Sequence, residues 1–376
     1  MPEFDLALLA IKFPWATMLL AFAVSVASIL ILMPVARRAG WVDRPSARKS
    51  HEGEIPLIGG WAIVLSLLII QLFGTGQAAP AGFWTGAFLL FSVALIDDRF
   101  PIRARYRLLV QIAAAIAGVS LGGAVLPDLG DLLGIGVLTQ WWIVAPVSVL
   151  GTVALINAVN FTDGADGLCG GLGFIGLFWF LMAVAVSNSY AVTNGDAPAD
   201  YAFSLIPLAA AMMGGLAGFL IFNLRRPGLP RALVFMGDSG STVVGFTLAW
   251  FAIHVTSAFG DSSVPPVVCL WIMAVPLADS VSCIVRRMLE GVPPMRADLK
   301  HLHHLARRSG LTIGQSVLVI YAGSFACGLI GVTGWWLHIA DRWLFAGFVG
   351  AVMAFVGITN LAWRRLEGTQ VLVQAG

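Results

Sequence analysis

Acidic, amide and histidine side chains gather in four short stretches of this chain, at residues 96–99, 157–167, 235–241 and 300–304. Carboxylate and amide oxygens are the ligands that hard divalent cations prefer. Glycines beside them let a backbone approach a ligand closely, and imidazoles donate hydrogen bonds to anions. The combination indicates chemistry on phosphates, assisted by a divalent cation.

The first two stretches supply most of the carboxylates. Asp97 and Asp98 are adjacent, and they suit metal–phosphate chemistry or a general base; the alternative is a solvated helix end. The second stretch holds Asn157, Asn160, Asp163 and Asp166 with two glycines, in the order Asn157-Ala-Val-Asn160-Phe-Thr-Asp163-Gly-Ala-Asp166-Gly. Because Asn157 and Asn160 are three residues apart, both can face one way at a helix end.

The third stretch, Phe235-Met-Gly-Asp238-Ser-Gly-Ser, places an aspartate between glycines at the start of an apolar run. There the carboxylate can hold a cation while free backbone N–H groups meet a phosphate; the alternative is simple helix capping.

The fourth stretch contains three histidines in four residues: His301, His303 and His304. A zinc site is disfavoured, because the chain has no H-E-x-x-H and its four cysteines are isolated. Phosphate and sugar recognition suits the surrounding arginines better, with a basic loop attracted to anionic lipid as the alternative. Asp279, inside an apolar stretch, is expected to pair with Arg286, Arg287 or a neighbouring helix.

Membrane helices must position these stretches. The 376 residues are 59% hydrophobic and 11% charged, whereas soluble proteins carry about 25% charged residues. This composition excludes a soluble enzyme, and a net charge of +2 gives no reason to expect nucleic acid as a partner. We predict an all-α integral membrane protein, with about eleven transmembrane helices and one polytopic domain over residues 1–376. The predicted spans are 15–35, 57–73, 82–96, 107–123, 141–156, 169–187, 203–222, 241–256, 266–284, 312–332 and 343–363.

The basic residues orient these spans. Of the 22 Lys and Arg, all but Lys12 and Arg342 fall in five alternate loops or ends. The positive-inside rule therefore predicts an outside N-terminus and a cytoplasmic C-terminus. The four polar stretches then lie on the cytoplasmic face of the membrane.

The four polar stretches, in this order, resemble the motifs of the polyprenyl-phosphate N-acetylhexosamine-1-phosphate transferases. The resemblance includes two segments that precede them, Gly40–His51 and Ile55-Pro-Leu-Ile-Gly59-Gly60. The resemblance covers about residues 15–365 and is strongest to the bacterial WecA/TagO type, which uses UDP-GlcNAc and undecaprenyl phosphate. It implies eleven transmembrane helices and an active site on the cytoplasmic face of the bacterial inner membrane. In the histidine motif, Leu302 stands where the family usually has isoleucine.

The resemblance also implies roles for single residues. Asp238 would bind Mg²⁺ (with Mn²⁺ as an alternative), and Asn160 would be a second ligand. The catalytic acids would be Asp97, Asp98, Asp163 and Asp166. The substrate-binding residues would be Lys49, His51, Asn223, Phe235, Arg287, Asp298, His301, His303 and His304.

The expected reaction transfers GlcNAc-1-phosphate to undecaprenyl phosphate and releases UMP, as the first membrane step of a cell-envelope glycan. The alternatives are a sister transferase that uses another UDP-2-acetamido sugar or UDP-MurNAc-pentapeptide, and a transporter or lipid flippase without chemistry. The other expected partner is membrane lipid, and a homodimer is an open possibility.

Overall fold

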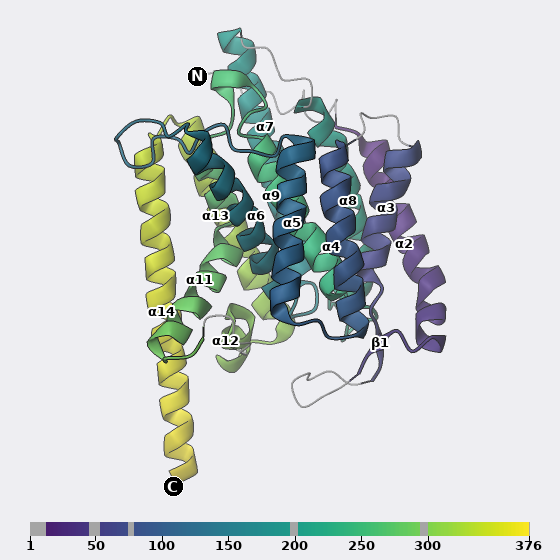
Figure 1. Cartoon of the computed structure of the whole chain (residues 1–376). Coiled ribbons are helices and arrows are strands. Elements are labelled where there is room, and N and C mark those ends of the chain that lie inside the picture. Colours follow the sequence, from purple (N-terminus) through teal and green to yellow (C-terminus); the bar gives the residue numbers. More distant parts are fainter. Residues whose placement is uncertain (1–12, 45–52, 74–78, 196–201, 294–299, 376) are drawn as a thin grey trace.

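The computed structural model describes residues 13–44, 53–73, 79–195, 202–293 and 300–375. Lys49, His51 and Asp298, expected to bind substrate, lie outside the described residues. The described chain is helical apart from one small sheet, in which β1 (Val42–Asp43) pairs antiparallel with β2 (Ile55–Pro56). Figure 1 shows the helices as a bundle, with β1 and the C-terminus at one end.

All eleven predicted spans coincide with helices. The first six are α2 (Trp15–Arg38), α3 (Gly59–Phe73), α4 (Ala81–Arg99), α5 (Ala104–Gly122), α6 (Trp141–Phe161) and α7 (Leu168–Asn194). The others are α8 (Ala202–Asn223), α9 (Gly237–His254), α10 (Pro266–Ile272) with α11 (Ala274–Leu289), α13 (Ile313–Trp336) and α14 (Asp341–Ala375). A short η1 (Gly260–Ser262) precedes α10, and α12 (Leu302–Arg308) carries two of the histidines.

Within the described residues, eight helices are long and apolar enough to cross a bilayer, and the bent segment η1–α10 with α11 makes a ninth. This finding supports a multi-pass membrane protein. The count of eleven stays a prediction, because α3 has only 15 residues and α9 begins with the polar residues Asp238, Ser239 and Ser241. The outer helices expose apolar side chains such as Ile31 on α2 and Ile358 on α14, as lipid contact requires.

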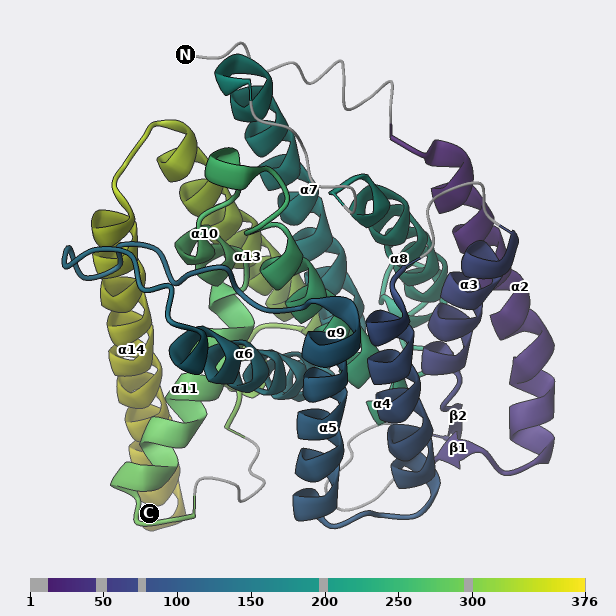
Figure 2. The ribbon, with the colours of Figure 1, turned by 45° about the horizontal axis from the view of Figure 1, so that its top comes forward.

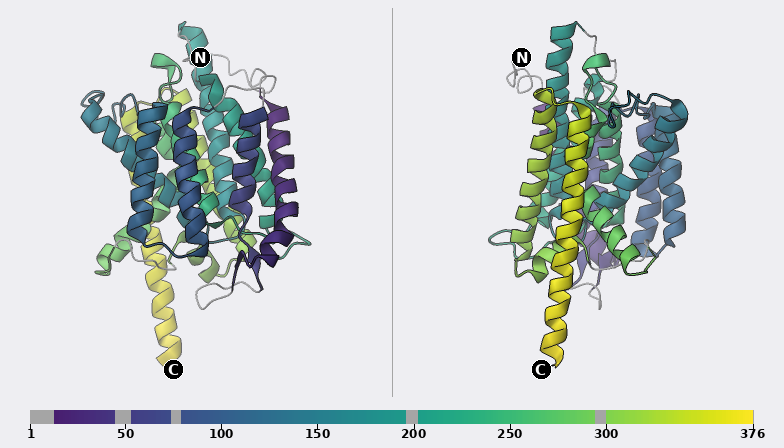
Figure 3. Two further views of the ribbon diagram at one scale, coloured as in Figure 1. Left: turned by 45° about the vertical axis from the view of Figure 1, so that its right-hand side comes forward. Right: turned by 90° about the vertical axis from the view of Figure 1, so that its left-hand side faces the viewer.

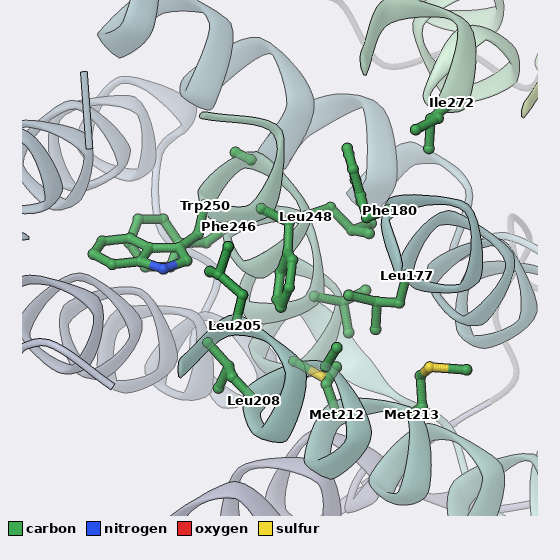
Figure 4. Close-up of a cluster of buried hydrophobic side chains, with 14 of the residues drawn as sticks. Leu177, Phe180, Leu205, Leu208, Met212, Met213, Phe246, Leu248, Trp250 and Ile272 are labelled. Carbon is green, nitrogen blue, oxygen red and sulfur yellow. The ribbon is translucent and has the colours of Figure 1, made fainter. Parts of the chain in front are cut away.

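The centre of the bundle is α9, whose residues are nearly all buried. It lies against α3, α4, α6 and α7 (Figure 2). Figure 4 shows Phe246, Leu248 and Trp250 of this helix among apolar side chains of α7, α8 and α10. Because neighbouring helices surround α9, they also fix the position of its N-terminus. Asp238 lies in this first turn.

Small residues bring α8 close to α2. A Cβ on Gly218 would lie 2.8 Å from the carbonyl oxygen of Phe22, and Ser25 Oγ donates to the Gly215 carbonyl at 2.8 Å. In lipid the hydrophobic effect does not drive helices together, so helices associate through close packing of this kind. At the opposite edge, α14 runs along the bundle and extends past the other helices at its C-terminal end (Figure 3).

Candidate functional site

The polar stretches meet at one end of the bundle, the end that carries β1 in Figure 1. Asp97 and Asp98 lie in the last turn of α4, and Asn160 lies in the last turn of α6. Arg107 lies in the first turn of α5, and Asp238 is the second residue of α9. The up-and-down order of the helices therefore unites residues that are up to 141 positions apart in the sequence.

Arg107 joins two of the predicted acids. Its Nη1 donates to Asp97 Oδ2 at 2.6 Å and to Asp238 Oδ2 at 2.8 Å. The side chain of Asp97 is only 6% exposed, and its other oxygen accepts from the backbone N–H of Ile102 at 2.5 Å. One guanidinium thus balances part of the negative charge of two carboxylates.

Asp98 holds the N-terminus of α9. Its Oδ1 accepts from the Asp238 N–H at 2.8 Å and its Oδ2 from the Ser239 N–H at 3.3 Å. A carboxylate at this place satisfies two of the orphan N–H groups of the helix and complements its positive end. Gly237, the first residue of α9, has φ +75°, and a Cβ there would lie 2.7 Å from Asp98 Oδ2.

The two asparagines connect α6 to its neighbours. Asn160 Nδ2 donates to Asp238 Oδ1 at 3.1 Å and to Ser241 Oγ at 2.8 Å. One turn earlier, Asn157 and Gln111 of α5 exchange hydrogen bonds of 2.7 and 3.3 Å. These contacts fix the ends of α5, α6 and α9 relative to one another, and with them Arg107 and Asp238.

A small open cavity lies between α4, α5, α6 and α9. Its polar side is formed by Asp97, Arg107, Gln111, Asn160, Asp238 and Thr242. Its apolar side is formed by Leu90, Val93, Ala94 and Val110. The cavity is therefore amphipathic, as a site for a charged group on a hydrocarbon chain would be.

The two acids of the second polar stretch, Asp163 and Asp166, have different surroundings. Burial, and after it the negative charges of Asp238, Asp98 and Asp166, raise the pKa of Asp163 well above its usual range. Asp166 instead accepts from Arg225 Nε at 2.6 Å and from the Ala232 N–H at 3.2 Å. It thereby ties the loop after α6 to the loop after α8.

The predicted substrate-binding pair Asn223 and Phe235 lies beside the motif that precedes α3. Asn223 is buried, and it accepts from the Gly167 N–H at 2.7 Å and donates to the Val234 carbonyl at 2.8 Å. The backbone of Phe235 bonds to Pro56 and to Gly59, each at 2.9 Å. The residues 55–60 therefore support the segment that leads into Asp238.

The histidines stand at the start of α12, next to the second polar stretch. His301 caps this helix, and its ring centroid lies 5.3 Å from that of Phe161. His303 is buried; its Nε2 has no hydrogen-bond partner and lies where a Cβ of Gly164 would be. Arg287 is buried on α11. The rings of His303 and His304 are 4.1 Å apart.

Asp279 pairs with the histidine motif rather than with an arginine. Its Oδ2 lies 2.9 Å from His301 Nδ1, and its Oδ1 accepts from the Leu302 N–H at 2.8 Å. Cys283, expected to be an isolated apolar residue, has its sulfur 3.4 Å from the same Nδ1. These three residues have the donor atoms of a zinc site, but Arg286 Nη2 donates to the sulfur at 3.2 Å, and a guanidinium there opposes a cation.

Sequence reasoning missed Arg107 and Gln111 as members of the site, and Cys283 as a neighbour of His301. The available signal for Arg107 was its place at the first position of a predicted span, on the same side as Asp97 and ten residues after it. Gln111 follows one turn later as a polar residue in an apolar span. Nothing in the sequence separates Cys283 from the other three cysteines.

The sequence of this chain is similar to those of known proteins. The model of glycosyl transferase family 4 matches residues 80–256, which contain α4 to α9 and three of the four polar stretches. A Haemophilus influenzae protein described as undecaprenyl-phosphate alpha-N-acetylglucosaminyl 1-phosphate transferase is 34% identical over 338 residues, covering 90% of this chain and 91% of the relative.

Two further relatives carry the same description. The Pasteurella multocida protein is 35% identical over 350 residues, which cover 93% of this chain and 94% of the relative. The Yersinia pestis protein is 33% identical over 346 residues, which cover 91% of this chain and 90% of the relative. At this identity over nearly the whole chain, the protein belongs to the family of polyprenyl-phosphate N-acetylhexosamine-1-phosphate transferases.

Proposed function

We propose that this protein transfers GlcNAc-1-phosphate from UDP-GlcNAc to undecaprenyl phosphate and releases UMP. The observation that carries the proposal is the amphipathic cavity, in which Asp97, Asp238 and Asn160 meet around Arg107 beside an apolar wall. The relatives' descriptions name the same acceptor and the same sugar phosphate. A lipid phosphate would place its phosphate against the polar side of the cavity and its hydrocarbon chain against the apolar side.

The residues fit a hard divalent cation. Burial is the main cause of the raised pKa of Asp163, and the further contributions of Asp238, Asp98 and Asp166 show that four carboxylates lie close enough together to interact. Asp238 and Asn160 would hold Mg²⁺, or Mn²⁺ in its place, because carboxylate and amide oxygens are the ligands that such ions take. When bound, the ion would neutralise pyrophosphate charge and stabilise the phosphate that leaves.

The protein's own side chains then supply position and positive charge. An oxygen of the lipid phosphate forms a bond to the sugar-side phosphorus, the bond to UMP breaks, and UMP leaves with the electron pair. The acceptor is a phosphomonoester with a second pKa of about 6, so it is largely a dianion near neutral pH and needs no general base. Arg107 and the histidines would orient the two anions, while Asp97 and Asp98 would hold Arg107 and the start of α9 in place.

The membrane arrangement completes the proposal. We place the N-terminus outside, the C-terminus and the site in the cytoplasm, and eleven spans in the bacterial inner membrane. The support is the basic loops that lie beside the site, together with Arg99, Arg225, Arg286 and Arg307 at the same helix ends. A nucleotide sugar would reach the site from the cytoplasm, and a prenyl chain would reach it from the bilayer.

Purified protein given UDP-GlcNAc, undecaprenyl phosphate and Mg²⁺ tests the proposal. We expect UMP and lipid-linked GlcNAc pyrophosphate in equal amounts, and neither product from Asp238→Asn. A matched control is Asp261→Asn, since Asp261 lies in η1 at the other end of α9. Turnover of UDP-MurNAc-pentapeptide or UDP-GalNAc in preference to UDP-GlcNAc would change the donor assignment. Lipid movement without UMP release would refute transfer altogether.

A further inference from the structure

An aspartate that the proposed reaction does not use lies beside the histidine motif. Asp279 sits on α11 and is 6% exposed, and an acid at such a place is costly unless it is paired. Both of its oxygens contact the start of α12: one lies 2.9 Å from His301 Nδ1, and the other accepts from the Leu302 N–H at 2.8 Å. The carboxylate thus fixes the ring and the helix that follows it.

This contact decides which edge of His301 is left for a ligand. Nδ1 faces Asp279 Oδ2 and the sulfur of Cys283. Within the part of the chain that the structure describes, Nε2 of His301 has no hydrogen-bond partner. The ring stands 5.3 Å from that of Phe161, so it borders the stretch that carries Asn160, one of the two proposed metal ligands.

Two neighbours of the ring, Asp279 and Cys283, favour a cationic imidazole, and Asp279 is the carboxylate of the two. From α11 it faces Asp279 and Cys283, with Arg286 bonded to that sulfur at 3.2 Å and to the Lys300 carbonyl at 2.6 Å. From its own segment it faces the stacked ring of His303, and it also interacts with His304; both oppose a positive charge on His301 when protonated. Asp279 is therefore the carboxylate on which the charge of His301 depends.

The direction of the pKa agrees with this geometry. Burial lowers the pKa of His301, but the hydrogen bond to Asp279, the contact with Cys283 and the charge of Asp279 raise it to about 10. His303 has no such partner. Burial, and after it the positive charges of His304, His301 and Arg307, lower the pKa of His303 to about 3. Of these two stacked rings, only that of His301 is cationic near neutral pH.

We propose that Asp279 is a positioning residue for the sugar-nucleotide donor, holding His301 as a charged hydrogen-bond donor whose Nε2–H binds a phosphate of the pyrophosphate. The inference rests on the proposed function, because it names the part of that site that receives the donor's negative charge. The pair resembles a general device in which a carboxylate fixes the tautomer and orientation of an imidazole.

The test compares Asp279→Asn with the wild-type protein across pH 6 to 9. Asparagine keeps the size of the side chain and removes its charge, so His301 should lose its proton at or below the usual histidine range of about 6.5. We expect the KM for UDP-GlcNAc to rise about tenfold between pH 6.5 and 8.5 in this variant, and to stay level in the wild type. The kcat and the Mg²⁺ requirement should change little.

Cys283→Ser is the matched control, because serine keeps a polar group beside Nδ1 and leaves the carboxylate of Asp279 in place. It should keep the level pH profile of the wild type. In a His301→Gln background, Asp279→Asn should add nothing to the donor KM, because the charge that it supports is already gone. An equal loss at every pH, or an additive effect in the double variant, would mean that Asp279 only supports the fold, and would overturn the inference.

Binding of UDP-GlcNAc, measured over the same pH range without acceptor, separates the two proposals. If binding of UDP-GlcNAc weakens with rising pH in Asp279→Asn while the wild type shows no turnover, the pairing of Asp279 with His301 is supported and the transfer reaction is refuted. Normal turnover with a level profile in Asp279→Asn would support the reaction and refute the pair. Absence of both binding and turnover in the wild type would overturn both.

Discussion

Gly237→Ala is the sharpest test of how the site is built. Gly237 has φ +75°, a conformation that costs a residue with a side chain about 1–2 kcal/mol. The new methyl group would also lie 2.7 Å from Asp98 Oδ2, so the carboxylate must move away. That movement breaks its hydrogen bonds to the N–H groups of Asp238 and Ser239.

The two costs can be separated. A hydrogen bond to a charged group contributes about 1.5–3 kcal/mol, and each 1.4 kcal/mol of lost transition-state stabilisation slows a reaction about tenfold. If even one of the two bonds to Asp98 matters for the position of Asp238, turnover should fall about 10- to 100-fold. The unfolding free energy should fall by about 1–2 kcal/mol from backbone strain alone.

Gly228→Ala provides the matched control. Gly228 has φ +83°, so alanine is equally strained there, but nothing lies within 4 Å of its added methyl group. Gly228→Ala should lose stability through backbone strain alone, and Gly237→Ala should lose somewhat more because it also breaks the contacts of Asp98. Only Gly237→Ala should lose turnover, measured as UMP release from UDP-GlcNAc with saturating acceptor and Mg²⁺. Equal activities in the two variants would show that the contact between Asp98 and the start of α9 does not position the site.

Three further predictions follow from the same residues. Asp238→Asn should lose at least about 100-fold in kcat with little change in melting temperature, and chelation of Mg²⁺ but not of zinc should stop the wild type; activity of the variant at low Mg²⁺ would contradict this. Because Asp279 raises the pKa of His301 above its unfolded value to about 10, their pairing should stabilise the fold fully below pH 6.5 and lose its effect as pH rises through 10. The melting temperature of the wild type should therefore decline more steeply between pH 6.5 and 10 than that of His301→Gln, and parallel curves would disprove the pairing. A cysteine placed at exposed Arg226 should react with impermeant reagents only in inverted vesicles, and one at exposed Leu133 only in intact cells; the reverse pattern would invert the topology.

The helices and their common end were predictable because both follow from local patterns. Apolar runs of membrane length predicted the spans, and alternating basic loops predicted that Asp97, Asp163 and Asp238 share one side. The break at Met273 was not predicted, although Pro276 signals it: a proline has no N–H for the carbonyl four residues earlier, and the helix is interrupted there. The span 266–284 consequently became the bent pair α10 and α11.

The pairing of side chains could not be read from the sequence. Which residue Arg107 contacts depends on the lateral order and rotation of α4, α5 and α9, which hydropathy does not encode. Asp279 was expected to pair with Arg286 or Arg287, one or two turns away on its own helix, or with a neighbouring helix. The chain that returns from α11 instead brings His301 onto that carboxylate, a contact set by a loop whose path no periodicity describes.

The double ion pair of Arg107 has a consequence for the order in which the site is assembled. A divalent cation entering alone would approach Asp238 while a guanidinium nitrogen stands 2.8 Å from one of its oxygens, and the two positive charges would repel each other. An incoming pyrophosphate removes that conflict, because it gives Arg107 a new anion and brings negative charge for the metal. We therefore expect the metal to bind weakly to the free protein and tightly with the nucleotide, so that the two enter as one kinetic unit and the lipid follows.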